Sequence, residues 1–429
     1  MTYPTISPEL TLDFAKSEQL DPRITFSRSS SATYLGSDGL IKTAPDGVAR
    51  FEHDSDGKCL GLLVEEARTN LCVQSETFTG SPFTLEGATA AKNEADPGGG
   101  NDATRITLSS GNVKHRIREL ISNARVIRSF FLKKVNCRYI YILDNNGGYY
   151  GPSYKIDLDL GVITLIKNSH QGSYPSYGFD IQEASNGYYR VWFDAIQVNM
   201  WAMYPSNTDY PAGSSLPVTF DADGTEAFVL YGYQVESAIG FPTSYIPTAG
   251  STVTRAADVA SIAGTNFSSW YNQTGGTLAT NSKVYPLPSG FTQRPYCAVI
   301  MNSGGSQYWG QTWENCENGT VRVDTTAGAQ ASSTGLNLQT DQISDIFYKS
   351  ALGVEFSGDA SVNGIGRHSH QGLTTTYVSV PKNTAFVDRL TFGTRINGNG
   401  QTGIWQGHIS RLSYYPERVS DESLEVLTA

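Results

Sequence analysis

Short alternating runs of apolar and polar residues, separated by turn signals, constrain the fold of this chain more than any other feature. Residues 188–196 and 227–234 alternate strictly, as a half-buried strand requires. Gly, Asn and Asp stand between such runs, and the pair Asp38 and Gly39 between two short apolar runs is the strongest hairpin signal. The pattern predicts short strands and tight turns along the whole chain.

The composition favours the same fold class. Charged residues make up 17% of the chain, which holds 43 Gly, 24 Tyr and 18 Phe, a mixture that suits pleated, half-buried strands and their turns. No repeat of fixed period and no sustained heptad occurs, which argues against a solenoid, a propeller or a coiled-coil shaft. We therefore predict an all-β protein built from tandem β-sandwiches.

The length of 429 residues exceeds what one hydrophobic core usually organises, so we expect several modules. Residues 1–71 are interpreted as a β meander that is too thin to fold alone and packs on a neighbouring module or another subunit. Residues 72–260 and 261–429 have the strand spacing of β-sandwiches, joined by a linker at 240–253.

Two local segments give further predictions. Residues 113–127 fit either a helix or two strands, and we favour two strands because the neighbouring segments are strands. At the end of the chain, Ser420 is expected to cap a short helix over residues 421–427, where acidic residues in the first turn suit the helix dipole.

The net charge of −10 argues against anionic partners, because nucleic acid and anionic bilayers would repel the average surface. Residues 1–10 lack the basic and apolar regions of a secretory signal, and no apolar run is long enough to cross a bilayer. We therefore expect no nucleic-acid binding and no membrane insertion. The odd number and irregular spacing of the cysteines fit neither a disulfide framework nor a zinc site, so we expect buried thiols at Cys59, Cys72, Cys137, Cys297 and Cys316.

Three stretches, 21–45, 61–71 and 241–258, closely resemble motifs of a family of phage and prophage structural proteins. That resemblance implies an N-terminal meander (1–71), a carbohydrate-binding-like jelly roll (72–260) and a concanavalin A or laminin G-like sandwich (261–429). Residues 409–427 look like the last strand and short helix of such a sandwich. The motifs contain no catalytic residue, so the resemblance implies a virion component and transfers no activity.

Aromatic residues in polar loops are the candidate glycan contacts, because aromatic faces stack on the apolar faces of sugar rings. Residues 199–211 form such a loop in the sequence pattern, and Trp309 and Trp313 flank Gln311 in a polar segment of Gly, Asn and Glu. The alternative is that these aromatics hold long loops or fill subunit interfaces. The candidates are Trp201, Tyr204, Tyr210, Trp309, Gln311 and Trp313.

One basic island stands out in this acidic chain, at Arg116, Arg118, Arg125 and Arg128. The planar guanidinium group of arginine can form paired hydrogen bonds with the phosphates and carboxylates of acidic polysaccharides. The same residues would fit a solvated strand face or a contact surface for an acidic neighbouring subunit. We favour these two interpretations over glycan binding.

The sequence predicts no catalytic centre, since it has no nucleophile elbow and its carboxylates cannot be paired from sequence. Asp221 and Asp223 superficially resemble the start of a calcium loop, but Gly232 stands where the closing Glu should be, so a turn is favoured. His368 and His370 lack an identifiable third metal ligand. We expect no cofactor, with a structural calcium ion as the alternative.

Together these features predict a non-enzymatic fibre or appendage protein on a bacteriophage particle, made in the host cytoplasm and binding host surface glycans during adsorption. Its other partners would be virion proteins at a head or tail attachment site, and analogy with phage fibres suggests a homotrimer. Two alternatives stay open: a structural head or tail decoration or spacer protein without glycan binding, and a polysaccharide-depolymerising tailspike.

Overall fold

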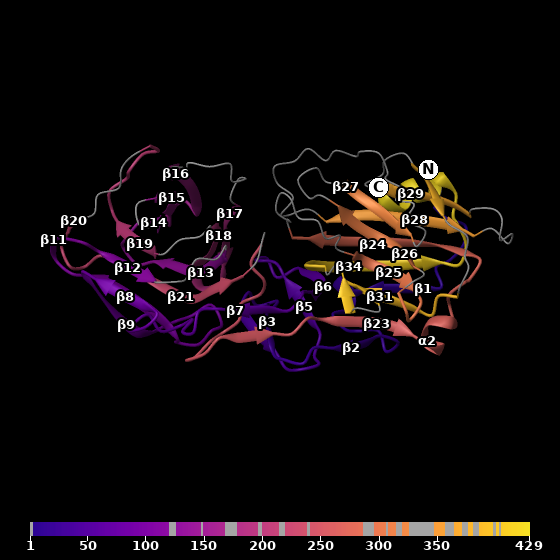
Figure 1. The fold of residues 1–429 in the computed structure, drawn as a ribbon, viewed down its shortest axis with the longest axis horizontal. Helices are drawn as coiled ribbons and strands as arrows, with labels where there is room; N and C mark the ends of the chain where they lie inside the picture. Colours follow the sequence, from indigo (N-terminus) through magenta and orange to yellow (C-terminus); the bar gives the residue numbers. More distant parts are fainter. Residues whose placement is uncertain are drawn as a thin grey trace.

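The computed structural model is almost entirely antiparallel β-sheet. Two β-sandwiches lie at opposite ends of its longest axis (Figure 1). The predicted all-β class with tandem sandwiches is therefore confirmed. The structure describes residues 3–119, 126–146, 149–167, 178–195, 200–213, 219–237, 241–285, 296–305, 308–314, 320–325, 347–356, 364–370, 376–380, 386–397, 400–402 and 405–429.

Two sheets form the C-terminal sandwich. The first contains, in spatial order, β30 (Thr376–Val380), β29 (Gly364–His370), β28 (Tyr348–Glu355), β24 (Gly275–Val284), β34 (Gly407–Tyr415), β6 (Cys59–Val64) and β5 (Arg50–His53), and β1 (Leu10–Asp13) pairs with β34. The second contains β2 (Thr25–Ser27), β23 (Val259–Ala263), β31 (Arg389–Phe392), β25 (Tyr296–Met301), β26 (Tyr308–Glu314) and β27 (Thr320–Thr325). Leu62, Ile300 and Ile409 belong to the core that both sheets share.

The N-terminal segment completes this C-terminal sandwich. Leu10 of β1 pairs with Tyr414 of β34, and Leu62 of β6 pairs with Ile409 of the same strand. In the other sheet, β2 pairs with β23. These partners are separated by most of the chain, so the meander and the last third of the sequence share one core.

Two further sheets form the middle sandwich. One contains β17 (Phe179–Ala184), β18 (Tyr188–Ala195), β13 (Val126–Lys134), β21 (Ala227–Glu236), β10 (Ala103–Leu108) and β9 (Ala88–Glu94), while β7 (Arg68–Asn70) pairs with β21 and with β22 (Val253–Arg255). The other contains β16 (Val162–Lys167), β15 (Tyr149–Asp157), β14 (Tyr139–Asn146), β19 (Met200–Ser206), β12 (Arg116–Glu119) and β8 (Phe83–Glu86). Phe130, Phe193 and Met203 lie in the core between them.

Short elements complete the described part of the chain. The two-stranded sheets are β3 (Ala32–Leu35) with β4 (Ile41–Ala44), β11 (Gly111–Val113) with β20 (Phe220–Ala222), and β32 (Arg395–Asn397) with β33 (Gly400–Thr402). The helices are α1 (Phe14–Ser17), η1 (Ser185–Gly187), α2 (Thr265–Ser268) and α3 (Asp421–Thr428). No helix among the described residues has the length and apolar character needed to cross a bilayer.

Three local predictions are confirmed. Gly39 adopts a left-handed φ of 73° in the turn between β3 and β4, a conformation that glycine takes without steric cost. In segment 113–127 the structure has strand β12 and the start of β13 and no helix among the described residues. The Ser420 side chain accepts a hydrogen bond from the Ser423 N–H at 3.2 Å and caps α3.

Candidate functional site

Five charged side chains form a buried ion-pair network between the two sandwiches. We call these residues the junction network, and each is at most 1% exposed. All five lie in or beside the stretches that carry the family resemblance. They are Arg28, Arg50, Glu65, Arg255 and Asp258.

Arg50 is the centre of the junction network. Its two terminal nitrogens lie 2.8 Å from the Glu65 carboxylate and 2.5 Å from the Asp258 carboxylate. Arg28 contacts the other oxygen of Asp258 at 3.0 Å, and Arg255 lies 3.5 Å from Glu65. Each carboxylate is therefore shared between arginines, which offsets the cost of removing its charge from water.

Backbone and hydroxyl groups complete the coordination of these charges. The Ser244 N–H and hydroxyl both donate to Glu65 at 2.7 Å. Arg50 also donates to the Thr33 carbonyl at 2.8 Å, and Arg28 donates to the Pro45 carbonyl at 2.8 Å. Ser244 follows the last long strand of the middle sandwich. Its two hydrogen bonds to Glu65 therefore connect that sandwich to the N-terminal segment.

The charge state of Glu65 follows from its partners. Burial disfavours the ionised carboxylate, but attraction to Arg255 and Arg50 and the Ser244 hydrogen bonds outweigh burial and hold the pKa of Glu65 well below its usual range. For Arg50, burial is likewise outweighed by Asp258 and Glu65, so its pKa is raised. Glu65 and Arg50 are therefore both ionised at neutral pH.

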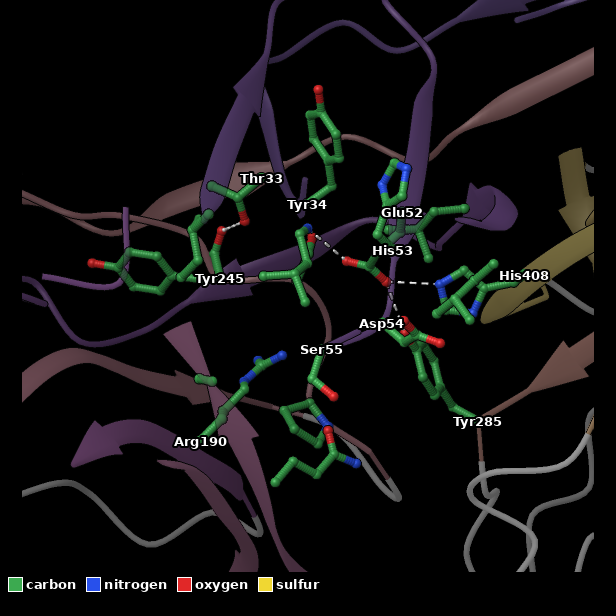
Figure 2. A pocket seen from close by; sticks show the side chains of 18 of the residues that line it. Thr33, Tyr34, Glu52, His53, Asp54, Ser55, Arg190, Tyr245, Tyr285 and His408 are labelled. Carbon is green, nitrogen blue, oxygen red and sulfur yellow. Dashed lines mark hydrogen bonds and ion pairs between the residues drawn. The ribbon is translucent and has the colours of Figure 1, made fainter. Parts of the chain in front are cut away.

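A pocket of about 520 Å³ lies beside the junction network. Its wall combines residues of the N-terminal segment, the middle sandwich, the linker and the C-terminal sandwich, and exposed Gln182 and Glu183 lie at its solvent side. Figure 2 shows Glu52, Tyr285 and His408 on one side of the pocket and Arg190 and Tyr245 on the other.

Glu52 is a carboxylate in the pocket wall with three partners. It accepts from the Leu35 N–H at 3.1 Å and from the Tyr285 hydroxyl at 3.3 Å, and it lies 2.7 Å from Nε2 of His408. Burial raises its pKa, but the His408 contact outweighs burial, and the net pKa of Glu52 is lowered. Glu52 is therefore an ionised hydrogen-bond acceptor.

Aromatic rings and a guanidinium form the rest of the wall. Phe241 and Tyr285 stack with ring centroids 4.3 Å apart and planes 6° from parallel. Arg190 donates to the Thr243 carbonyl at 2.6 Å and lies over the Phe131 ring at 5.7 Å. Sequence reasoning missed this pocket because its residues come from distant segments, although Phe241 belongs to a stretch that the resemblance singles out.

The prediction that Trp201 lies exposed in a loop is wrong. Trp201 belongs to β19 and is fully buried, packing against Phe130, Phe193 and Tyr233 at centroid distances of 5.6, 5.9 and 5.1 Å. The polar residues after 205 suggested a loop, but β19 pairs on both sides, with β12 and β14. A strand in the middle of a sheet turns every second side chain into the core.

The exposed placement of Trp309 is also wrong. Trp309 is 2% exposed in β26, and its indole N–H donates to the Tyr271 hydroxyl at 3.0 Å inside the C-terminal core. Gln311 and Trp313 lie on the same strand, opposite Val323 and Val321 of β27, and their side chains lie outside the described part of the structure.

Tyr204 and Tyr210 stay half-buried on the surface of the middle sandwich. Arg116 donates to the Tyr204 hydroxyl at 2.9 Å, so one basic candidate and one aromatic candidate meet. The Tyr210 backbone N–H donates to the Tyr141 hydroxyl at 2.9 Å, which ties its loop to β14.

The four arginines of the predicted basic patch do not form one surface. Arg116 and Arg118 lie 2.7 and 3.5 Å from the Glu86 carboxylate, so that acid offsets their charge. Arg128 is 1% exposed in the core, 3.8 Å from Glu119, and its placement in a surface patch is wrong. β13 is an inner strand, so its inward residues cannot reach solvent. Arg125 lies outside the described residues.

Glu119 is a buried acid that sequence reasoning missed. Burial raises its pKa to about 7 against the opposing effects of Arg128 and the Tyr233 hydroxyl, which donates at 2.5 Å. Glu119 lies in the core of the middle sandwich and does not line the pocket. Its local sequence gave no sign of this environment, because its partners come from other strands.

Asp221 and Asp223 lie at a turn. Asp221 belongs to β20, while the Asp223 carboxylate accepts from the backbone N–H and the hydroxyl of Thr225, both at 2.7 Å. This is the local bonding of an Asp-initiated turn. His368 and His370 lie on β29, and their side chains lie outside the described part of the structure. The described cysteines, Cys59, Cys72, Cys137 and Cys297, are buried and free, as predicted.

Comparison with solved structures includes weak likenesses to a carbohydrate-binding module. No family model matches the chain, and no curated protein matches it. Two solved structures of the CBM40 module of a Ruminococcus gnavus IT-sialidase, one bound to α2,3-sialyllactose, match at 12% identity over 38% of this chain and 88% of theirs, with TM-scores of 0.27 and 0.25. A likeness this weak carries no argument, so the fold assignment depends on the sheets described above.

Replacing Arg50 by Ala should lower the free energy of unfolding by about 3–5 kcal/mol, because Glu65 and Asp258 would lose a buried partner. The control is Lys42→Ala, which removes an exposed ion pair with Asp38 and should leave the free energy of unfolding nearly unchanged. Urea denaturation of both variants measures the difference. Equal small losses would contradict a structural role for the junction network.

Acidification should weaken the fold through Glu65. Its folded-state pKa lies below the unfolded value of about 4.3, so its stabilising contribution is present above that pH and is lost as the pH falls through the folded pKa. Urea denaturation between about pH 6 and pH 3 should show the wild type losing on the order of 2 kcal/mol more than Glu65→Gln. A wild-type advantage that stays constant across this range would refute this assignment.

Proposed function

We propose that this chain is a non-enzymatic surface component of a bacteriophage particle and that the pocket beside the junction network binds a glycan of the host cell. The observation that carries the proposal is the wall of that pocket. It places the stacked Phe241 and Tyr285 rings beside an ionised carboxylate and the guanidinium of Arg190. Aromatic faces suit the apolar faces of sugar rings, and charged groups suit their hydroxyls.

The size and position of the pocket support glycan binding. A volume of about 520 Å³ lies within the range of about 300–1,000 Å³ typical of small-ligand sites. The exposed residues Gln182 and Glu183 place its opening at the surface, where a sugar chain can enter. Binding at the meeting point of several segments also gives a rigid wall, which limits the entropy lost on association.

The charge state of the pocket supports binding over hydrolysis. A glycosidase needs one carboxyl group that stays protonated near neutral pH to donate a proton to the leaving group. The pKa values of Glu52 and Glu65 are both lowered, so both carboxylates are ionised. Each also accepts hydrogen bonds from fixed protein donors, which favours a structural or ligand-orienting role.

The placement on a virion is supported by the resemblance of stretches 21–45, 61–71 and 241–258 to phage and prophage structural proteins. In the proposal, the protein is displayed on the particle as a homotrimer after synthesis in the host cytoplasm. It attaches to other virion proteins at the head or the tail. Several copies on one particle would raise the avidity of a weak single-site interaction.

Glycan-array binding with three variants tests the proposed site. Tyr285→Ala removes the stacking face and should abolish detectable binding, whereas Tyr285→Phe removes only the hydroxyl and should keep most of the affinity. Gln182→Ala, on the exposed rim, should weaken binding by roughly 1 kcal/mol, the usual contribution of one hydrogen bond. The matched control is Tyr210→Ala, a half-buried tyrosine on the middle sandwich outside the pocket.

Three outcomes would overturn the proposal. If the folded wild type binds no host glycan, the spacer or decoration role replaces it. If it releases reducing sugar from host polysaccharide, the protein is a depolymerase. If Tyr210→Ala abolishes binding and Tyr285→Ala does not, the site lies on the middle sandwich surface near Tyr204. Circular dichroism confirms that each variant is folded.

A further inference from the structure

Three different metal-ligating side chains gather next to the turn of the β5–β6 hairpin. One ligand atom from each of Glu18, His53 and Cys59 lies within 4.8 Å of the others. His53 and Cys59 are buried, and the Glu18 side chain is 51% exposed. A carboxylate, an imidazole and a thiol in this arrangement form a ligand set that zinc uses in proteins.

The backbone sets these three positions. His53 ends β5 and Cys59 begins β6, and the two residues are direct cross-strand partners. Asp54 holds the intervening turn by accepting hydrogen bonds from the N–H groups of Asp56 and Lys58. Glu18 follows α1 in a left-handed conformation, with φ of 49° and ψ of 32°. That conformation is uncommon for a residue with a side chain, and it places Glu18 beside the hairpin.

The buried His53 side chain lacks the hydrogen bonds that a buried imidazole usually makes. It is 5% exposed, yet among the described residues neither ring nitrogen has a hydrogen-bond partner. Burying polar atoms without hydrogen-bond partners destabilises a fold. Its Nε2 lies 3.4 Å from Oε2 of Glu18. Two ligands on one tetrahedral ion, each at about 2.0–2.2 Å, stand about 3.3–3.6 Å apart.

We propose that Glu18, His53 and Cys59 bind one zinc ion, with water in the fourth position on the exposed side of Glu18. Thiolate and imidazole ligands select zinc over calcium or magnesium, which prefer oxygen. The thiolate and the carboxylate together neutralise the charge of the ion. The ion connects the turn after α1 to the β5–β6 hairpin, and it also gives the buried imidazole a partner.

Binding requires the Cys59 thiol to lose its proton. Coordination transfers that proton to solvent, forms the sulfur–zinc bond and involves no change of oxidation state. Zinc affinity should therefore rise with pH.

Titration of the reduced, chelator-treated full chain with Zn²⁺, and with Co²⁺ as a spectroscopic substitute, tests the site. One equivalent of each ion should bind. The Co²⁺ complex should show the near-ultraviolet band of thiolate-to-metal charge transfer and the visible bands of tetrahedral coordination. Cys59→Ser should abolish the charge-transfer band. Glu18→Gln should weaken Zn²⁺ binding at least about tenfold.

Two matched control variants distinguish the loss of a metal ligand from the loss of any acidic residue or any buried thiol. Glu9→Gln makes the same change of charge at an exposed position of the N-terminal segment, and Cys72→Ser removes a buried thiol from the middle sandwich. Both should bind Co²⁺ like the wild type. Absence of stoichiometric binding to the wild type, or a charge-transfer band that persists in Cys59→Ser, overturns the proposal. Because Glu18 is half-exposed, Glu18→Gln is expected to fold, and unchanged Zn²⁺ affinity in that variant would also overturn it.

Discussion

The contact of Arg50 with Glu65 and Asp258 is the interaction on which the rest of the structure depends. Buried ion pairs gain little net stability over apolar packing, but one partner left alone is costly, so they favour a single arrangement of the segments that supply them. Here Arg50 and Glu65 belong to the N-terminal meander, and Asp258 directly precedes β23 of the C-terminal sandwich. The Ser244 bonds to Glu65 add the chain that leaves the middle sandwich.

Strand β5 connects the three sites. Arg50 lies in the junction network, Glu52 accepts hydrogen bonds in the pocket wall, and His53 belongs to the proposed zinc cluster. Glu52 and His53 are adjacent on β5, and both line the pocket. A shift in β5 would therefore change the pocket and the cluster together, and the junction network opposes such a shift.

Local sequence pattern predicted the strands, the hairpin at Gly39 and the helix capped by Ser420, because these features depend on neighbouring residues. It failed for Trp201 and Trp309, whose burial depends on which strands flank β19 and β26. It also failed for Arg128, whose partner Glu119 lies on another strand. Cross-strand pairing between distant segments is not encoded in local periodicity. For the same reason the pocket was missed, and the cysteine spacing gave no sign of the cluster at Cys59.

The central claim is that the junction network joins the two sandwiches into one cooperative unit. Differential scanning calorimetry of the full wild-type chain tests it directly, because a two-state transition has equal calorimetric and van't Hoff enthalpies. The account predicts one transition with a ratio of these enthalpies near one. Two separate transitions in the wild type, each with the enthalpy of one sandwich, would show that the sandwiches unfold independently and would contradict it.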